Sequence, residues 1–95
     1  MSEEFDERVL ARVEAIPPGQ VLTYGLIAEE IGQGGPRQVG QVMSRLGHLV
    51  CWWRVVRADG TLPAPLMMEA QEHWARESTP VKRGRVDVPR AVGGI

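Results

Sequence analysis

Residues 23–47 read TYGLIAEEIGQGGPRQVGQVMSRLG, a pattern that predicts two short helices joined by a glycine-rich turn. Thr23 is a suitable N-cap for the first helix and Gly32 a suitable terminator, because a hydroxyl accepts a backbone N–H and glycine tolerates left-handed backbone. Pro36 suits the start of the second helix, where its missing N–H costs no hydrogen bond, and Gly47 is expected to close it. The apolar residues at helical spacing are Leu26, Ile27 and Ile31 in the first helix and Val39, Val42, Met43 and Leu46 in the second. A helix-turn-helix is therefore expected, a motif of DNA-binding proteins that also occurs in helical corners without a nucleic-acid partner.

The segments around this motif predict further helices and little β-structure. Apolar residues recur at helical spacing from Phe5 to Ile16, and Pro17-Pro18-Gly19 ends that helix. Val21-Leu22 is long enough only for a short extended segment. Downstream we expect a buried extended segment over 49–56, a helix over about 66–77, and a two-stranded edge around the turn at 82–85. The predicted fold class is mainly α with minor β.

Length and composition indicate one small folded domain. The chain has 95 residues, of which 43% are hydrophobic and 24% charged. We expect a single domain over 1–95, with its core at about 5–88 and a loose tail at 89–95. Its apolar runs are too short to cross a bilayer, and the acidic N-terminus lacks the pattern of a signal peptide, so a cytoplasmic protein is expected. Cys51 is the single cysteine and no cluster has metal-ligand spacing, so we expect no disulfide, metal or cofactor.

The net charge of −1 conceals an asymmetry along the chain. Residues 1–35 contain seven acidic and two basic residues (−5), whereas residues 36–95 contain nine basic and five acidic residues (+4). Binding to phosphate depends on a local basic face more than on the total charge. A solvated surface gives the same statistics. The residues that could supply such a face are Arg37, Arg45, Arg54, Arg57, Lys82, Arg83, Arg85 and Arg90.

Three motifs, in the right order, resemble a known family. The segment 16–28, IPPGQVLTYGLIA, resembles the opening of the DNA-binding domain of O6-alkylguanine-DNA alkyltransferases. Residues 37–43, RQVGQVM, are similar to that family's recognition helix. Arg54-Val55-Val56, followed by Asp59-Gly60, is similar to the stretch after its active-site motif Pro-Cys-His-Arg-Val. The resemblance covers about residues 5–88 and implies a winged-helix-like domain that contains a helix-turn-helix.

The sequence departs from the family at the active-site motif. Trp52 occupies the position of the alkyl-accepting cysteine, Trp53 that of the histidine, and Cys51 that of the proline. Tryptophan at the cysteine position is typical of the alkyltransferase-like proteins, a non-enzymatic branch that usually keeps the proline and the histidine. The segment 44–51 is also shorter than is usual in the family. The resemblance therefore implies that the chain is not an enzyme.

An active alkyltransferase that uses Cys51 is the first alternative. Alkyl transfer needs a thiolate, and a thiol with a free pKa of about 8.5 is mostly protonated at neutral pH unless a base activates it. That base has been replaced by Trp53. In an extended segment Cys51 and Trp52 would also point to opposite sides, so we interpret Cys51 as a buried structural thiol.

The resemblance assigns roles to particular residues. Arg37 corresponds to the arginine finger that fills the place of an extruded base. Trp52 is expected to wall a lesion pocket together with Tyr24, Arg54 and Val55, and Tyr24 also to contact the phosphate of the flipped nucleotide. Gly40 suits a helix pressed into the minor groove. Further DNA contacts are expected from Gln38, Val39, Gln41, Ser44 and Arg45.

Other residues near the motifs have plainer interpretations. The loop from Leu62 to Pro65 is expected to form one lip of the pocket, with Leu66 and Met67 behind it. Trp53 is interpreted as core, and His48 and His73 as exposed residues without a partner.

The function implied by the resemblance is that of a monomeric DNA-damage sensor. Such a protein would bind double-stranded DNA from the minor groove, flip O6-alkylguanine out of the stack, and hold it without transferring the alkyl group. The bound complex, in the cytoplasm and associated with the nucleoid, would mark the site for nucleotide excision repair proteins; no membrane is involved. Besides repair through Cys51, a sequence-specific helix-turn-helix regulator that contacts bases in the major groove remains an alternative.

Overall fold

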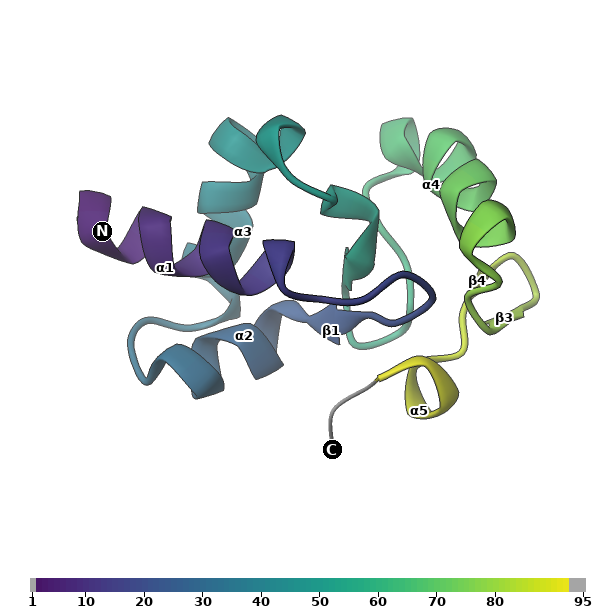
Figure 1. The fold of residues 1–95 in the computed structure, drawn as a ribbon, viewed down its shortest axis with the longest axis horizontal. Helices are drawn as coiled ribbons and strands as arrows, with labels where there is room; N and C mark the ends of the chain where they lie inside the picture. The colour runs from purple at the N-terminus through teal and green to yellow at the C-terminus, as the bar shows by residue number, and fades with distance from the viewer. Residues whose placement is uncertain (1, 93–95) are drawn as a thin grey trace.

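The predicted helix-turn-helix forms with the expected caps. The computed structural model describes residues 2–92, in which α2 (Tyr24–Ile31) and α3 (Pro36–Leu46) pack against each other (Figure 1). The Oγ1 of Thr23 accepts a hydrogen bond from the Leu26 N–H at 3.1 Å. Gly32 ends α2 in the left-handed region, with φ 73°. At the start of α3, the Gly35 N–H donates to Oε1 of Gln38 at 2.9 Å. These local contacts confirm the two-helix pattern in the sequence.

A first hydrophobic core lies where α1 (Glu3–Glu14) packs against α2 and α3. Ser2 caps α1 by accepting a hydrogen bond from the Phe5 N–H at 3.2 Å. The fully or almost fully buried residues of this core are Phe5, Val9, Val13, Ile16, Leu22, Ile27, Ala28, Val39, Val42 and Val55. Most of them are the residues that stand at helical spacing in the sequence. Burial of this apolar surface is what fixes α3 on the rest of the fold.

A second core lies beneath α4 (Ala64–Glu77). Its largest member is Trp74, whose indole Nε1–H donates to the Trp53 carbonyl at 2.8 Å. The two cores meet at a short parallel pair, β1 (Leu22–Thr23) and β2 (Val55–Val56). Val55 packs in the first core and Val56 in the second. The other buried residues of the second core are Val21, Leu62, Ala70, Val86 and Ala91.

The predicted two-stranded edge is an antiparallel hairpin of β3 (Val81–Lys82) and β4 (Arg85–Val86). It is joined backbone to backbone to the turn that contains Gly60, because the Val86 N–H donates to the Gly60 carbonyl at 3.0 Å. A Cβ at Gly60, where φ is 83°, would lie 2.1 Å from the Val86 carbonyl oxygen, so this close approach requires glycine. The mainly α fold with minor β is thus as predicted.

The segment 49–56 differs from the prediction of a continuous extended stretch. Gly47 is the C-cap of α3, as predicted, but its right-handed backbone leads directly into a 3-10 turn, η1 (Gly47–Leu49). A second 3-10 turn, η2 (Trp52–Arg54), follows, in which the Arg54 N–H donates to the Cys51 carbonyl at 3.1 Å. Val55 and Val56 form the strand β2 and are fully buried, whereas Trp52 and Trp53 are half-buried in the 3-10 turn. The β-branched residues therefore marked the strand correctly, and the aromatic residues did not.

The prediction of a loose tail at 89–95 is wrong for its first part. A short helix, α5 (Val88–Ala91), packs Ala91 into the second core. The Val21 N–H donates to the Ala91 carbonyl at 3.0 Å, and Val21 forms a parallel bridge with Val92. Residues 93–95 lie outside the described residues.

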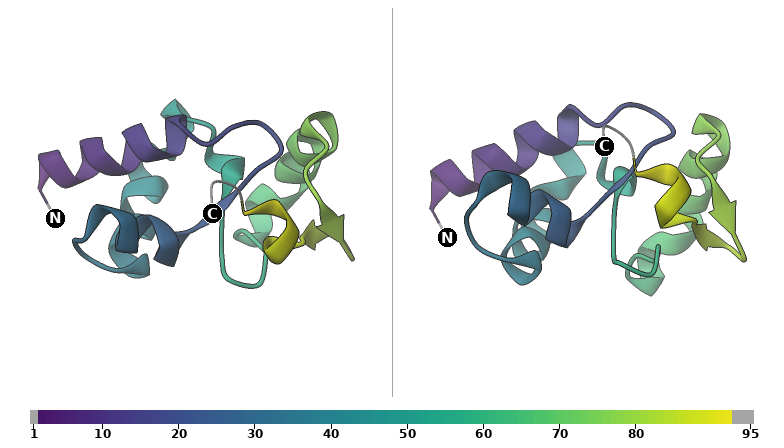
Figure 2. Two further views of the ribbon diagram at one scale, coloured as in Figure 1. Left: turned by 60° about the horizontal axis from the view of Figure 1, so that its bottom comes forward. Right: turned by 90° about the horizontal axis from the view of Figure 1, so that it is seen from below.

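The elements divide between two sides of the molecule. In the view from below (Figure 2, right), α1 lies along one edge, whereas the beginning of α3, the 57–63 loop and the tip of the β3–β4 hairpin lie toward the opposite edge. From there α3 runs back behind α1, against which it packs. Within residues 2–92, no helix has the length and apolar character needed to span a bilayer.

Candidate nucleic-acid interface

A hollow of about 510 Å³ lies between α3, η1 and the beginning of α4, with Trp52 in its wall; we call it the Trp52 pocket. Its lining is mostly apolar or small, and Glu69 is the acidic residue among the lining side chains. On α3 the lining residues follow i, i+3, i+4, i+7 spacing, so one helix face forms that wall. The lining residues are Tyr24, Gly40, Met43, Ser44, Gly47, His48, Trp52, Leu62, Pro63, Pro65, Leu66 and Glu69.

The 3-10 backbone of η2 decides which way three consecutive side chains point. With about three residues per turn, successive side chains are separated by about 120°. Trp52 therefore lines the pocket, Trp53 turns toward α4, and Arg54 turns toward the loop after α1. Trp53, interpreted as core from the sequence, is half-buried and packs against the second core. The 3-10 turn, and not strand alternation, directs its side chain away from that of Trp52. Cys51, which is half-buried, does not line the pocket.

An aromatic cluster holds the Trp52 ring. Trp53 stacks on His73 with ring centroids 3.6 Å apart and an interplanar angle of 4°. Trp52 packs at nearly a right angle to both, at 5.7 Å from Trp53 and 5.9 Å from His73. The interpretation of His73 as an exposed residue without a partner is therefore wrong, since it is half-buried in this stack. His48, by contrast, is exposed and lies at the pocket.

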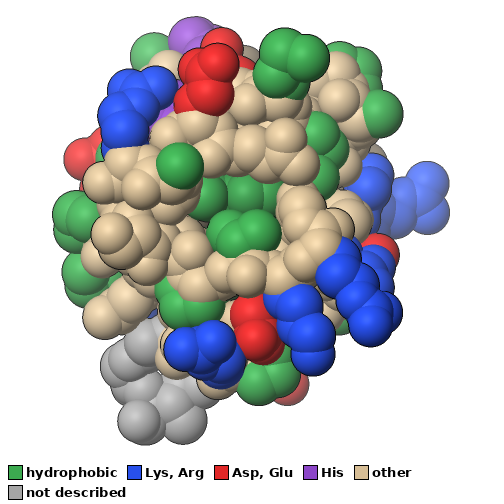
Figure 3. All heavy atoms as spheres, turned by 90° about the vertical axis from the view of Figure 1, so that its right-hand side faces the viewer, with side chains coloured by type: hydrophobic (Ala, Val, Ile, Leu, Met, Phe, Trp, Pro, Cys, Tyr) green, Lys and Arg blue, Asp and Glu red, His purple; other side chains and the backbone are tan. Residues whose placement is uncertain are grey.

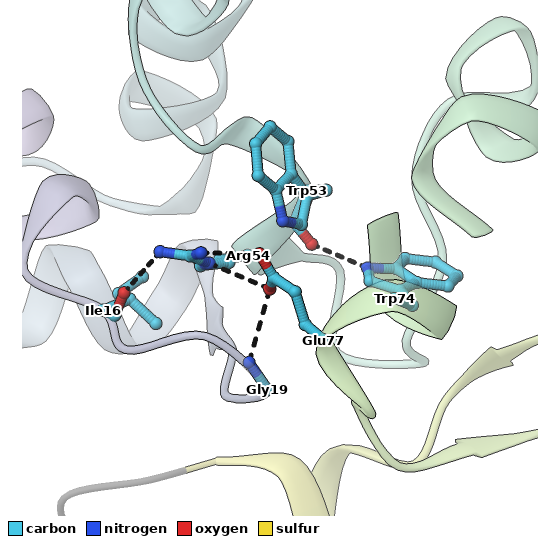
Figure 4. Close-up of polar contacts among 6 residues, drawn as sticks. All are labelled: Ile16, Gly19, Trp53, Arg54, Trp74 and Glu77. Carbon is cyan, nitrogen blue, oxygen red and sulfur yellow. Dashed lines mark hydrogen bonds and ion pairs between the residues drawn. The ribbon is translucent and has the colours of Figure 1, made fainter. Parts of the chain in front are cut away.

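A buried ion pair fixes η2 from the opposite side (Figure 4). The Arg54 guanidinium donates from Nε to Glu77 Oε1 at 3.0 Å and from Nη2 to Oε2 at 2.5 Å. Its Nη1 donates to the Ile16 carbonyl at 2.9 Å, and the Gly19 N–H donates to Glu77 Oε1 at 3.3 Å. The exposed fractions of the two side chains are 11% and 14%. Arg54 is thus held by Glu77 and does not line the pocket, so that prediction is wrong.

The charge of Glu77 is maintained by these contacts. Burial alone raises its pKa, but the hydrogen bonds that it accepts from Arg54 and from the Gly19 N–H outweigh burial, and the pKa is lowered below its ordinary value. At neutral pH the pair is ionised. It ties η2 to the loop after α1 and to the end of α4, and so orients the turn from which Trp52 projects.

Two further predicted site residues lie in the core instead. Val39 and Val55 are 0% exposed, because both pack in the first core beneath α3. Neither can contact DNA or a flipped base. Their place in the recognition-helix and active-site motifs reflects packing rather than binding.

The other residues predicted on α3 are accessible. Arg37, Gln41, Ser44 and Arg45 are exposed, and Gly40 is half-buried at the pocket. Arg45 forms an ion pair with Asp6 at 3.1 Å. Arg37, in the first turn of α3, forms no ion pair or hydrogen bond with any residue of 2–92. Its guanidinium is therefore available to a ligand.

Tyr24 and the lip residues border the pocket as expected. Tyr24 is the first residue of α2, and burial raises the pKa of its hydroxyl despite the nearby positive charge of Arg57. The hydroxyl is therefore protonated at neutral pH and can donate a hydrogen bond. Leu62, Pro63, Pro65 and Leu66 line the opposite wall, while Met67 lies behind it and accepts the Leu62 N–H at its sulfur at 3.3 Å.

Sequence reasoning missed four lining residues, namely Met43, Gly47, His48 and Glu69. Met43 was assigned to the apolar stripe, although its spacing from Gly40 and Gly47 places it on the pocket face of α3. Glu69 stands one turn after Pro65 on α4, a spacing that could have identified it once the lip was proposed. Among the described residues, no group of three or more histidine, cysteine, aspartate or glutamate side chains could hold a metal ion.

Comparisons with known proteins identify relatives of this chain. The family model of the 6-O-methylguanine DNA methyltransferase DNA-binding domain matches residues 4–79. A DNA base-flipping protein of Escherichia coli (strain K12) is 37% identical over 94 residues, which cover 93% of this chain and 73% of that protein. Alkyltransferase-like protein 1 of Schizosaccharomyces pombe is 44% identical over 64 residues, which cover 63% of this chain and 58% of that protein.

The fold matches that of a solved relative over its whole length. S. pombe Atl1, in a complex with damaged DNA containing O6-carboxymethylguanine, superposes with a TM-score of 0.86 at 27% identity, covering 100% of this chain and 99% of that one. The resemblance seen in the sequence motifs is thereby confirmed. By its sequence over residues 4–79 and by its fold, the chain belongs to the family of the 6-O-methylguanine DNA methyltransferase DNA-binding domain.

Proposed function

We propose that this protein is a DNA-damage sensor that flips O6-alkylguanine into the Trp52 pocket and holds it there without removing the alkyl group. The observation that carries the proposal is the pocket itself. It is a largely apolar hollow beside the second helix of a helix-turn-helix, with a tryptophan in its wall and no thiol among its lining residues. The names of the relatives, a DNA base-flipping protein and an alkyltransferase-like protein, support the same function.

Base flipping is energetically feasible with the groups present. Extrusion of a nucleotide costs a few kcal/mol, and less where alkylation has already weakened the base pair. Stacking of a base on an aromatic side chain contributes about 1–3 kcal/mol, which is comparable to that cost. Trp52 can therefore retain the base without a covalent bond, while Arg37 fills the vacated place in the stack. The protonated hydroxyl of Tyr24 supplies a donor to the phosphate of the flipped nucleotide.

The placement of Cys51 supports the proposal that the protein does not repair the lesion. A nucleophile must reach the alkyl carbon, but Cys51 does not line the pocket, and the position of the activating histidine is held by Trp53, which stacks on His73. A protein that binds a lesion without removing it requires a second process to do so. We propose that the complex, formed by the monomer at the nucleoid in the cytoplasm, marks the site for nucleotide excision repair proteins.

The proposal is tested by binding to two duplexes at one salt concentration, identical except for a single O6-methylguanine. We expect tighter binding to the lesion and an unchanged protein mass after incubation. A mass increase of one methyl group that disappears in Cys51→Ser would replace the sensor by an alkyltransferase. Equal binding to both duplexes, together with a preference for one sequence among further undamaged duplexes, would instead indicate a helix-turn-helix regulator.

Trp52→Ala is expected to weaken binding to the lesion duplex by about 10-fold or more, because base stacking of about 1–3 kcal/mol is lost. Trp52→Phe serves as the matched variant, since a smaller aromatic ring retains part of the stacking. Titration of fluorescently labelled lesion and undamaged duplexes measures both effects. If Trp52 were only a packing residue, the two variants would lose thermal stability and would weaken binding to both duplexes equally.

Gly40→Ala separates a binding role from a structural one. A Cβ at Gly40 meets no atom within 4 Å, and glycine in a helix interior costs about 1 kcal/mol relative to alanine, so the variant is expected to be more stable. Its binding to DNA is nevertheless expected to weaken, because the added methyl group keeps α3 away from the floor of the minor groove. Chemical unfolding and duplex titration of the same sample measure the two effects. A variant with higher stability and unchanged affinity would show that α3 does not press against DNA at Gly40.

A further inference from the structure

A second basic surface lies apart from α3, on the hairpin and the turn next to it. We define the hairpin cluster as Lys82, Arg83 and Arg85 together with Arg57. All four residues are exposed, and within residues 2–92 none forms an ion pair. Lysine and arginine side chains gather at this end of the molecule in Figure 3, at the lower right. Such a concentration of unpaired positive charge indicates an anionic ligand.

The strand register gives an independent indication. Lys82 and Arg85 are direct partners across the antiparallel pair, so their side chains project from the same face of the hairpin. Like charges at directly opposed positions destabilise a hairpin, so an anion bound between Lys82 and Arg85 would relieve their repulsion. A hollow of about 280 Å³ adjoins these residues and is also lined by Asp59 and Asp87. The pKa of Asp59 is lowered, first by the hydrogen bonds that its Oδ1 accepts from the hydroxyl and the N–H of Thr61 at 2.6 and 3.1 Å and then by the charges of Arg85 and Arg57. Its carboxylate therefore offsets part of the positive charge of the cluster, which still exceeds it.

The hairpin is held rigidly enough to present these charges in a fixed place. At its tip Arg83 and Gly84 both have positive φ, 56° and 81°, which forms a tight turn. The Gly84 carbonyl accepts a hydrogen bond from Gln71 of α4 at 2.8 Å. The hairpin base is joined to Gly60 in the adjacent turn. Cations in a fixed arrangement lose less conformational entropy on binding than cations on a flexible tail.

The hairpin cluster lies next to the Trp52 pocket, and this position indicates which anion it binds. The turn that contains Arg57 leads directly into the Leu62–Pro65 lip of the Trp52 pocket. The hairpin adjoins this turn, because Ala58 and Asp59 line one hollow together with Lys82 and Arg85, and both lie toward the same side of the molecule as the beginning of α3 (Figure 2). A duplex that lies on α3 with a base in the Trp52 pocket would continue past the hairpin.

We propose that the hairpin cluster binds backbone phosphates of the duplex on one flank of the lesion. This inference rests on the proposed function and extends it from the lesion to its flanking DNA. Phosphate contacts of this kind position a protein without reading sequence, and each one adds to the salt dependence of binding. The cluster thus raises affinity for any duplex of sufficient length and contributes nothing to preference for the lesion.

The test uses the double variant Lys82→Gln/Arg85→Gln, which leaves the strained position of Arg83 untouched. Its matched control is Arg8→Gln/Arg76→Gln, which removes the same charge from exposed positions on α1 and α4. Dissociation constants are measured against salt concentration for lesion and undamaged duplexes. The lesion is placed centrally or near either end, so that one flank at a time is too short to reach the hairpin.

We expect the hairpin variant to reduce the slope of log K against log[salt] by about 1 to 2, because each lost phosphate contact lowers it by about 0.9. The loss should be the same for lesion and undamaged duplexes and should vanish when one particular flank is shortened. The control should keep the wild-type slope. An unchanged slope in the hairpin variant would overturn the inference. The cluster would then be better explained as a binding surface for an acidic protein. A wild-type protein without lesion preference, whatever its slope, would instead contradict the proposed function.

Discussion

Replacement of Arg37 by alanine is expected to weaken binding to an O6-methylguanine duplex by about 10- to 100-fold, because loss of an arginine contact within the base stack costs about 1–3 kcal/mol. Arg37 has no partner among residues 2–92, so its removal should leave the thermal stability of the free protein unchanged. The dissociation constant for lesion and undamaged duplexes, measured with a melting curve for each protein, checks both expectations.

Two further variants distinguish an inserted arginine from a phosphate contact. Arg37→Lys keeps the charge but lacks the planar guanidinium that can stack on neighbouring bases, so it should restore little of the lesion binding. Arg8→Ala removes an exposed arginine from α1 and should change neither affinity nor preference. Full affinity in Arg37→Lys, together with an equal loss of affinity for lesion and undamaged duplexes in Arg37→Ala, would show that Arg37 is one phosphate contact among several.

The helix-turn-helix could be predicted from the sequence because its signals are local. Thr23 lies three residues from the N–H that it caps, and Gly32 adopts left-handed backbone at the end of its own helix. Apolar spacing identified the helices because their buried faces repeat at the helical period. Gly40 and Ser44, two of the residues on α3 that the sequence analysis expects to contact DNA, stand four residues apart and both line the pocket.

The parts that the sequence did not predict depend on distant partners. Arg54 lies 23 residues from Glu77, and no pattern within the 49–56 segment indicates that its side chain turns away from the pocket. His73 gains its stacking partner only because η2 is a 3-10 turn that directs Trp53 toward α4. Composition could not distinguish this turn from a strand, because burial favours aromatic and β-branched residues in both. The position of residues 89–92 likewise depends on Val21, whose N–H donates to the Ala91 carbonyl and which forms a bridge with Val92.

Glu77→Ala is expected to be the most destabilising single substitution proposed for this chain. Removal of one partner from a buried ion pair leaves the other charge uncompensated and typically costs about 3–5 kcal/mol. Here Arg54 is 11% exposed, and the Gly19 N–H would lose its acceptor as well. The free energy of unfolding in urea measures the loss. Glu72→Ala is the matched control, because Glu72 and Arg76 are exposed and 3.8 Å apart, and exposed pairs contribute about 0–1 kcal/mol.

A double substitution can show whether the ion pair accounts for the loss of stability in Glu77→Ala. The double variant Arg54→Met/Glu77→Leu buries no unpaired charge and should recover part of the stability that either single substitution removes. Lesion binding by this double variant tests whether the Arg54–Glu77 pair orients Trp52. In the variant, η2 would still pack against the core but would lose its hydrogen bonds to the 16–19 loop, so weaker lesion binding would support that role. Equal destabilisation by the single and the double substitutions would show that packing, rather than charge, accounts for the effect.

The stability contributed by Glu77 is also expected to depend on pH in one direction. Because the pKa of Glu77 is lowered in the folded protein, its contribution is fully present above the unfolded value of about 4.3 and is lost as the pH falls through the folded value. Glu77→Gln cannot ionise, so the difference in unfolding free energy between wild type and Glu77→Gln should be largest near pH 7. It should shrink progressively below about pH 4.3. Other carboxylates titrate in the same range, but they do so in both proteins and cancel in the difference. A difference that stayed constant from neutral to acidic pH would mean that the Glu77 carboxylate is not stabilised in its ionised form by Arg54 and Gly19.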